Sequence, residues 1–278
     1  VSNALIQDAT SCPENCGLCN LHTSHTVLAN LDLTNRCNMN CPICFANANQ
    51  AGYVYEPTFE EVVKMLETLR AEKPVPCTAI QFSGGEPTIY PRFFDVIKKA
   101  RELKFAQIQV ATNGVKLASD PEFAIKCAEA GLNTIYLQFD GLDDDIYMRS
   151  RGRKMMDVKN KAIENIRNVP NKRPSVVLVP TLVRGLNDHQ IGDIIRFAIK
   201  NMDVVRGVNF QPVAFTGRME QEEREKGRYT IPDLVKDIEE QTGYAHKKDW
   251  YPVPSVVPIS AYASAFLGKD KVTFSAHP

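Results

Sequence analysis

The sequence predicts an α/β fold, a partial (β/α)6 TIM-like barrel with an N-terminal cysteine-rich extension and an irregular C-terminal tail. Apolar, β-branched runs alternate with segments of helical period from residue 27 to residue 212. The alternation gives six units, whereas a closed TIM barrel has eight. Because strands that alternate with helices form parallel sheets with right-handed crossovers, we expect one open parallel sheet.

The predicted strands are short apolar runs, at residues 27–33, 78–83, 106–111, 133–139, 175–182 and 204–210. Amphipathic segments between them predict helices at 58–72, 91–104, 121–130, 157–168 and 188–201. Thr58 and Glu61 form a capping-box pattern at the start of the first helix. Gly131 follows the third helix, where a left-handed residue often ends a helix.

The chain divides into three parts on this pattern. Residues 1–26 form the cysteine-rich extension, 27–212 the barrel core, and 213–278 a last helix and a tail rich in tyrosine and proline. We expect the tail to close over the open side of the barrel. The sequence ends without a domain boundary, so we expect that it is a piece of a longer protein.

Composition excludes some classes of function. Lysine plus arginine and aspartate plus glutamate both total 33, so no net charge points to nucleic acid. The chain contains neither an apolar run of membrane-helix length nor a secretory signal, which predicts a cytoplasmic protein without a transmembrane segment. Six of the eight cysteines fall into two tight triplets, which favours metal binding over disulfides and a reducing, anaerobic setting.

The second triplet, Cys37, Cys41 and Cys44, follows the first predicted strand with the spacing C-x3-C-x2-C. Three thiolates in a compact loop can bind three irons of a [4Fe–4S] cluster and leave the fourth iron open to an exogenous ligand. Zinc also takes thiolates at short spacings, so the triplet alone leaves zinc as an alternative. The motifs that follow at later strand ends favour the cluster.

Functional residues are expected at the carboxyl ends of the strands, where barrels of this type carry their chemistry. Gly84-Gly85-Glu86 follows the second strand, and its glycines allow a ligand to approach the backbone closely. Asn113 follows the third strand, in an Asn-Gly pair that is otherwise a plain turn. Gln138 and Asp140 end the fourth strand and point to the same side, toward a ribose or a substrate.

Two charged segments lie outside these motifs. The loop with Arg149, Arg151, Arg153 and Lys154 could bind a phosphate or polar head group, although a solvated basic loop is the simpler interpretation. The mixed-charge run 218–226 is typical of an exposed helix or mobile loop.

The first triplet, Cys12, Cys16 and Cys19, repeats the C-x3-C-x2-C spacing before the first strand. It could hold a second iron–sulfur cluster, a zinc ion completed by His22 or His25, or no metal at all, and we favour the cluster. Cys77 precedes the second strand and could reach this triplet as a fourth ligand, or be a small core residue. Cys127 lies at a helical core position.

Taken together, the Cys37 loop and the Gly-Gly-Glu-Pro motif resemble those of the radical S-adenosylmethionine (SAM) superfamily. The resemblance implies a cluster on Cys37, Cys41 and Cys44 whose open iron chelates SAM. It places the SAM amino group at Gly84, Gly85 and Glu86, and further SAM contacts at the following positions of this chain: Ile43, Phe45, Asn113, Gln138 and Asp140. It also implies an electron donor such as ferredoxin or flavodoxin.

A closer resemblance rests on the N-terminal triplet, the His-x-x-His-Thr after it, Thr34-Asn35-Arg36-Cys37 and the Tyr-Pro-Val-Pro tail. These segments resemble an archaeal group of tetraether lipid synthases that was once linked to pterin methylation. The resemblance implies carbon–carbon coupling of lipid chains. A methyltransferase acting on a pterin or another small molecule is the alternative, and an iron–sulfur electron-transfer module without SAM chemistry is the alternative from another class.

Overall fold

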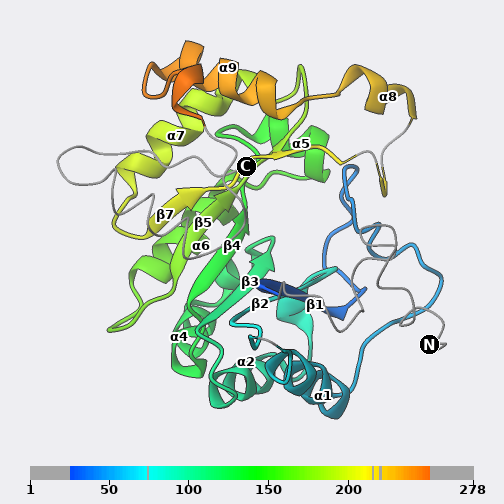
Figure 1. Cartoon of the computed structure of the whole chain (residues 1–278). Coiled ribbons are helices and arrows are strands. Elements are labelled where there is room, and N and C mark those ends of the chain that lie inside the picture. The colour runs from blue at the N-terminus through cyan, green and yellow to red at the C-terminus, as the bar shows by residue number, and fades with distance from the viewer. Residues whose placement is uncertain (1–25, 74, 215, 219–220, 251–278) are drawn as a thin grey trace, which may run out of the picture.

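The computed structural model describes residues 26–250 except 74, 215, 219 and 220 (Figure 1). Its centre is a six-stranded sheet in which every paired neighbour is parallel. In spatial order the strands are β1 (Leu28–Thr34), β2 (Ala79–Gly84), β3 (Gln107–Thr112), β4 (Thr134–Gln138), β5 (Ser175–Val179) and β7 (Val205–Val208). Spatial order follows chain order, so the predicted open parallel α/β sheet is confirmed.

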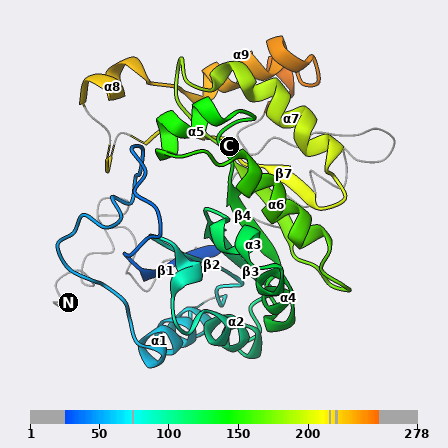
Figure 2. The same cartoon turned by 180° about the vertical axis from the view of Figure 1, so that it is seen from behind.

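Helices connect the strands and cover one face of the sheet (Figures 1 and 2). They are α1 (Phe59–Arg70), α2 (Phe93–Glu102), α3 (Val115–Ser119), α4 (Pro121–Ala130), α5 (Asp144–Arg151), α6 (Met156–Arg167) and α7 (Ile191–Lys200). Beyond the sheet lie α8 (Gln221–Lys226) and α9 (Ile231–Thr242). Short 3-10 turns occur at η3 (Pro87–Ile89), η4 (Asp188–Gln190) and η5 (Lys247–Asp249). None of the described helices is long and apolar enough to cross a membrane.

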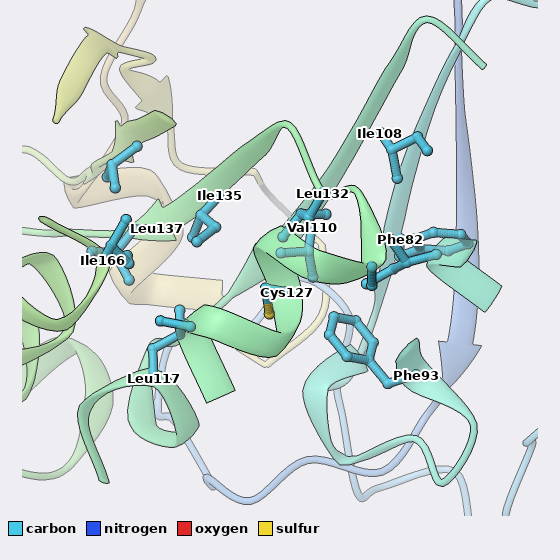
Figure 3. Close-up of a cluster of buried hydrophobic side chains, with 14 of the residues drawn as sticks. Phe82, Phe93, Ile108, Val110, Leu117, Cys127, Leu132, Ile135, Leu137 and Ile166 are labelled. Carbon is cyan, nitrogen blue, oxygen red and sulfur yellow. The ribbon is translucent and has the colours of Figure 1, made fainter. Parts of the chain in front are cut away.

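The strand register separates an apolar face from a polar one. Phe82, Val110 and Ile135 are successive partners across the sheet, and they are buried against the helices in the main core (Figure 3). The neighbouring row joins Gln81 to Gln109 and Gln109 to Thr134. Because side chains alternate between the two faces of a strand, this polar row faces away from the helices, toward the inside of the open barrel.

Cys127 is 1% exposed and lies within this core, as the sequence predicted (Figure 3). Burial raises the pKa of its thiol to about 12. It contacts apolar side chains, so it serves as a small hydrophobic residue.

Some elements differ from the prediction. Pro180 cannot donate a backbone hydrogen bond, and the expected strand 175–182 divides there into β5 and β6 (Thr181–Leu182). Strand β6 pairs with β8 (Gln211–Pro212) in a separate two-stranded sheet. Helix α5 occupies part of the expected basic loop; its signals were the Asp143 N-cap and the left-handed Gly152 at its end.

Three groups of predictions lie outside the described residues. They are the metal site at Cys12, Cys16 and Cys19, the possible ligands His22 and His25, and the closure of the barrel by the tail after Trp250.

Candidate functional site

The loop that carries Cys37, Cys41 and Cys44 follows β1, and we call it the cysteine loop. Its three cysteines line a shared cavity of about 1230 Å³. Within the described residues, no three cysteine, histidine or acidic side chains converge closely enough to hold a single metal ion. A [4Fe–4S] cubane takes one thiolate on each of three irons, and the three thiols of Cys37, Cys41 and Cys44 that line this cavity are a donor set that fits it.

Burial keeps the metal-free thiols of Cys37 and Cys41 protonated. It raises the pKa of Cys37 to about 11 and also raises the pKa of Cys41, although the nearby Arg151 opposes the shift at Cys41. Because iron binds the thiolate, loading of the loop must release these protons.

The loop around Cys37 is fixed by Asn49. The Asn49 Oδ1 accepts a hydrogen bond from the Cys37 N–H at 2.9 Å, and its Nδ2 donates to the carbonyls of Cys37 and Met39 at 3.0 and 3.1 Å. Asn49 has φ +67°, a left-handed conformation that asparagine tolerates better than most residues. No ligand-like pattern marks this position in the sequence, and the role of Asn49 emerges only from contacts across the loop.

The glycines after β2 are required by the chain itself. A Cβ on Gly84 would lie 2.3 Å from the Thr34 carbonyl oxygen, and one on Gly85 would lie 2.2 Å from the Arg36 carbonyl oxygen. Gly85 N–H donates to Thr34 O at 2.7 Å. These glycines allow close approach between segments of this chain, at Thr34 of β1 and Arg36 of the cysteine loop, while close approach of a ligand stays a prediction. Both also line the cavity, where a role in SAM binding stays a prediction.

Glu86 is 1% exposed, and its carboxylate accepts four hydrogen bonds. The donors are the Thr88 N–H, the hydroxyls of Thr88 and Thr112, and the Asn113 N–H. Burial raises the pKa of Glu86, and these hydrogen bonds oppose the shift. Glu86 thus joins the ends of β2 and β3, in addition to its position on the cavity wall.

Asn113 and Gln138 line the cavity, and both are oriented by hydrogen bonds. Asn113 Nδ2 donates to Asn38 Oδ1 at 2.7 Å, which connects β3 to the cysteine loop. Lys159 of α6 is fully buried, and its ammonium donates to Asn113 O at 2.7 Å and to Gln138 Oε1 at 2.8 Å. Burial lowers the pKa of Lys159 to about 7. Sequence reasoning missed Lys159 because it is a charged residue at a core position of a helix.

Asp140 does not line the cavity, and its carboxylate binds the chain itself. It accepts from Arg151 Nη2 at 2.8 Å, Ser150 Oγ at 3.0 Å and Thr181 N at 3.2 Å. Burial would raise the Asp140 pKa, but the charge and hydrogen bonds of Arg151 hold it below its usual range. The expected direct contact of Asp140 with a ribose or substrate is thus replaced by a contact that orients Arg151.

Arg151 corrects the interpretation of a solvated basic loop. Its side chain is 9% exposed, lies on α5, and donates to the Ile43 carbonyl at 2.8 Å as well as to Asp140. It also lies beside the Cys41 thiol and lines the cavity. A charged residue is buried here because its carboxylate partner is buried with it.

Ile43 and Phe45 both line the cavity, as expected for cofactor contacts. Ile43 packs on Val183, Leu186 and Val213, whereas Phe45 is 70% exposed. Their predicted contacts with SAM stay predictions.

Away from the cysteines the cavity becomes apolar. We use the name apolar lobe for its part lined by α7, β7, α9 and the residues after α9. The lobe includes Ile195, Ala198, Ile199, Val205, Leu234, Val235, Ile238 and Trp250.

Cys77, the expected fourth ligand of the N-terminal metal site, is fully buried in the main core. Its thiol donates to the Ala79 carbonyl at 3.2 Å, and burial raises its pKa. The described contacts favour the alternative of a core cysteine, while the triplet it was expected to join lies outside the described residues.

Comparison with known proteins identifies the family of this chain. The model of the Radical SAM superfamily matches residues 31–198. A Methanocaldococcus jannaschii protein named 7,8-dihydro-6-hydroxymethylpterin dimethyltransferase is 52% identical over 278 residues, which cover all of this chain and 54% of that protein. A probable GTP 3′,8-cyclase of Pyrococcus abyssi is 30% identical over 172 residues, or 61% of this chain and 52% of that protein. The chain spans about half the length of these curated relatives.

A solved structure shows the same fold. Streptococcus suis SuiB bound to S-adenosylmethionine gives a TM-score of 0.62 at 18% identity, with 78% of this chain and 47% of that chain covered. With the family match across β1 to α7 and the three thiols at one cavity, the conclusion is that this chain belongs to the radical SAM superfamily.

Proposed function

We propose that this chain binds a [4Fe–4S] cluster through Cys37, Cys41 and Cys44, together with SAM in the adjoining cavity. The observation that carries the proposal is that the three thiols line the same cavity as Gly84, Gly85, Glu86, Asn113 and Gln138. When bound to these residues and reduced, such a cluster would supply the electron for cleavage of SAM to methionine and a 5′-deoxyadenosyl radical, which would remove hydrogen from a substrate.

The chain's own residues would position these groups. Asn49 and Arg151 hold the cysteine loop, and Glu86 fixes the end of β3 so that Asn113 faces the cavity. The Lys159 ammonium donates a hydrogen bond to Gln138 Oε1 and so orients the Gln138 side chain at the cavity wall. The apolar walls of the lobe would exclude water from a reactive radical. A ferredoxin or flavodoxin is the proposed electron donor.

For the substrate, the name of the 52% identical relative supports methyl transfer to a pterin, which the sequence offered as an alternative. The polar row on the inner sheet face, which includes Gln81, supplies amide groups that could pair with a heterocycle. Gln81 Oε1 is buried without a partner among the described residues. We therefore propose methyl transfer to a pterin as the first candidate reaction.

A second candidate is carbon–carbon coupling of lipid chains, and the apolar lobe is the observation that favours it. A cavity of about 1230 Å³ is larger than the range of about 300–1,000 Å³ that holds most small ligands. An alkyl chain would fit the lobe's aliphatic walls better than a pterin ring would.

The test is anaerobic reconstitution followed by reduction with SAM present. We expect 5′-deoxyadenosine to form, and to disappear when Cys37, Cys41 and Cys44 are all replaced by alanine. Absence of SAM cleavage in a fully loaded protein would instead support the iron–sulfur electron-transfer module. Deuterated 7,8-dihydro-6-hydroxymethylpterin and deuterated archaeal lipid would be supplied in parallel; the substrate that transfers deuterium to 5′-deoxyadenosine identifies the class.

An auxiliary cluster on Cys12, Cys16 and Cys19 is a separate proposal. Iron analysis tests it, because two independent cubanes hold about eight irons and the triple alanine variant of the Cys37 loop would keep about four. A chain that binds about four irons, and none in the variant, would have no second cubane.

A further inference from the structure

Arg218 holds the cysteine loop from outside the sheet. It follows β8, far along the chain from the cysteines, yet its Nη1 donates to the Cys41 carbonyl at 2.9 Å and to Asn40 Oδ1. Its Nη2 donates to the carbonyl of Ala48. One guanidinium therefore bridges both sides of the loop that carries the thiols. The sequence predicts an exposed helix or mobile loop over the run 218–226; α8 is a helix within it, whereas Arg218 at its start contacts the cysteine loop.

The backbone makes the same connection. Cys44 and Arg218 form an antiparallel bridge in which Arg218 N donates to Cys44 O at 2.8 Å and Cys44 N donates to Arg218 O at 3.3 Å. Gly217 has φ +76°, and a Cβ there would lie 2.2 Å from the Cys44 carbonyl oxygen. Only glycine fits between residues 216–218 and the loop at this distance.

The charge of Arg218 is not neutralised by a carboxylate within the described residues. Arg151 of α5, which also donates to this loop, is paired with Asp140. The Arg218 Nε–H is buried and has no partner among the described residues, and Arg218 lines the cavity beside the cysteines. A buried donor without a partner is what a site presents when a bound group completes it.

We propose that Arg218 is a positioning residue for the cysteine loop. Its side chain holds residues 40–48 in place around the cluster and thereby slows the loss of iron. The proposal rests on the proposed function, because it requires that Cys37, Cys41 and Cys44 hold a cluster. Its physical basis is the planar fork of arginine, which reaches acceptors on two sides at once, as a lysine ammonium on a single stem does not. Without the fork, the carbonyl of the buried Ala48 and that of Cys41 lose their described partner.

The experiment compares anaerobically reconstituted Arg218→Met, Arg218→Lys and Gly217→Ala with the unmodified chain. The matched control is Arg228→Met, because Arg228 is an exposed arginine in the same segment. The readout is the rate at which a ferrous chelator removes iron, with the electron paramagnetic resonance spectrum of the reduced cluster recorded before and after addition of SAM.

We expect all three test variants to lose iron about 10–100-fold faster, the range found when partners that orient metal ligands are removed. The control should match the unmodified chain. Thermal unfolding of the metal-free proteins separates a local from a global effect. Because only two carbonyls lose their partner, a positioning role predicts that Arg218→Met unfolds at most about 10 °C below the control.

Unchanged iron release in Arg218→Met, with a normal cluster in the unmodified chain, would overturn the inference and leave the proposed function intact. If Arg218→Lys released iron as slowly as the unmodified chain, the role of the planar fork would be overturned. If metal-free Arg218→Met unfolded far below the control, Arg218 would be a general structural residue and the positioning role would be overturned. Failure of the unmodified chain to bind a cluster would overturn the proposed function itself.

Discussion

The two ends of the large cavity are built in different ways. At the cysteine end, side chains are fixed by hydrogen bonds to the backbone of neighbouring segments, as Glu86, Asn49 and Arg151 illustrate. At the apolar lobe the walls are aliphatic side chains of α7 and α9, and some, such as Ile199 at 38% exposure, remain partly open to solvent. Under the proposed function, the cysteine end would be a precise cofactor end and the apolar lobe an adaptable substrate end, because directional bonds fix positions while apolar contacts tolerate changes of shape.

The largest effect is expected at the cofactor end, from Asp140→Asn. The substitution leaves Arg151 buried without its counter-charge, which we expect to cost about 3–5 kcal/mol of unfolding free energy. Urea titration measures it. The matched control, Asp203→Asn, weakens an exposed ion pair with Arg167 and should cost far less. Equal losses in the two variants would show that burial of the Asp140 pair is unimportant.

Gly85→Ala should come next. Its Cβ would meet the Arg36 carbonyl, so the cysteine loop must shift, at a cost of about 1–3 kcal/mol together with weaker SAM binding. The control for the stability measurement alone is Gly207→Ala, because a Cβ at Gly207 meets nothing within 4 Å but Gly207 lines the cavity. Urea titration and calorimetric titration with SAM on the reconstituted protein give the two quantities. A Gly85→Ala variant as stable as the control would contradict the close approach.

A pH dependence should arise from Lys159, whose burial lowers its pKa to about 7. Between that pH and the ordinary lysine value of about 10.4, the unfolded chain binds more protons, so the folded state gains stability as pH rises. The gain is at most about 1.4 kcal/mol per pH unit, and Lys159→Met should lack it. Unfolding free energies of both metal-free proteins at pH 7 and pH 9 measure the difference. Parallel changes in the two proteins would mean that Lys159 does not titrate there.

The smallest effect on stability is expected at the lobe, from Ile199→Ser. This partly exposed position should change the unfolding free energy by less than about 0.5 kcal/mol. If an alkyl chain occupies the lobe, KM for the lipid should rise while SAM binding stays constant. A pterin substrate held at the polar end would show no change in KM, and this outcome would favour methyl transfer over lipid coupling.

Periodicity predicted the parallel sheet because apolar runs must be buried on the helix side, whatever the details of packing. The missed helix α5 is short and strongly charged, so its Asp143 cap and terminal Gly152 were weaker signals than its basic residues. The expected ligand contact of Asp140 could not be distinguished from an ion pair, because both functions require a carboxylate at a strand end.

The sequence by itself determined the class of site. Local spacing sets which residues share a loop, so the thiols of Cys37, Cys41 and Cys44 and the glycines after β2 were visible in the chain. Only the tertiary structure decided what holds that loop. Arg218 is separated from Cys41 by 177 residues and Arg151 from Ile43 by 108, and neither separation leaves a periodic or spaced pattern. Such contacts arise only when the sheet has brought the strand ends together, because buried charges and backbone carbonyls must then find partners among whatever residues lie beside them.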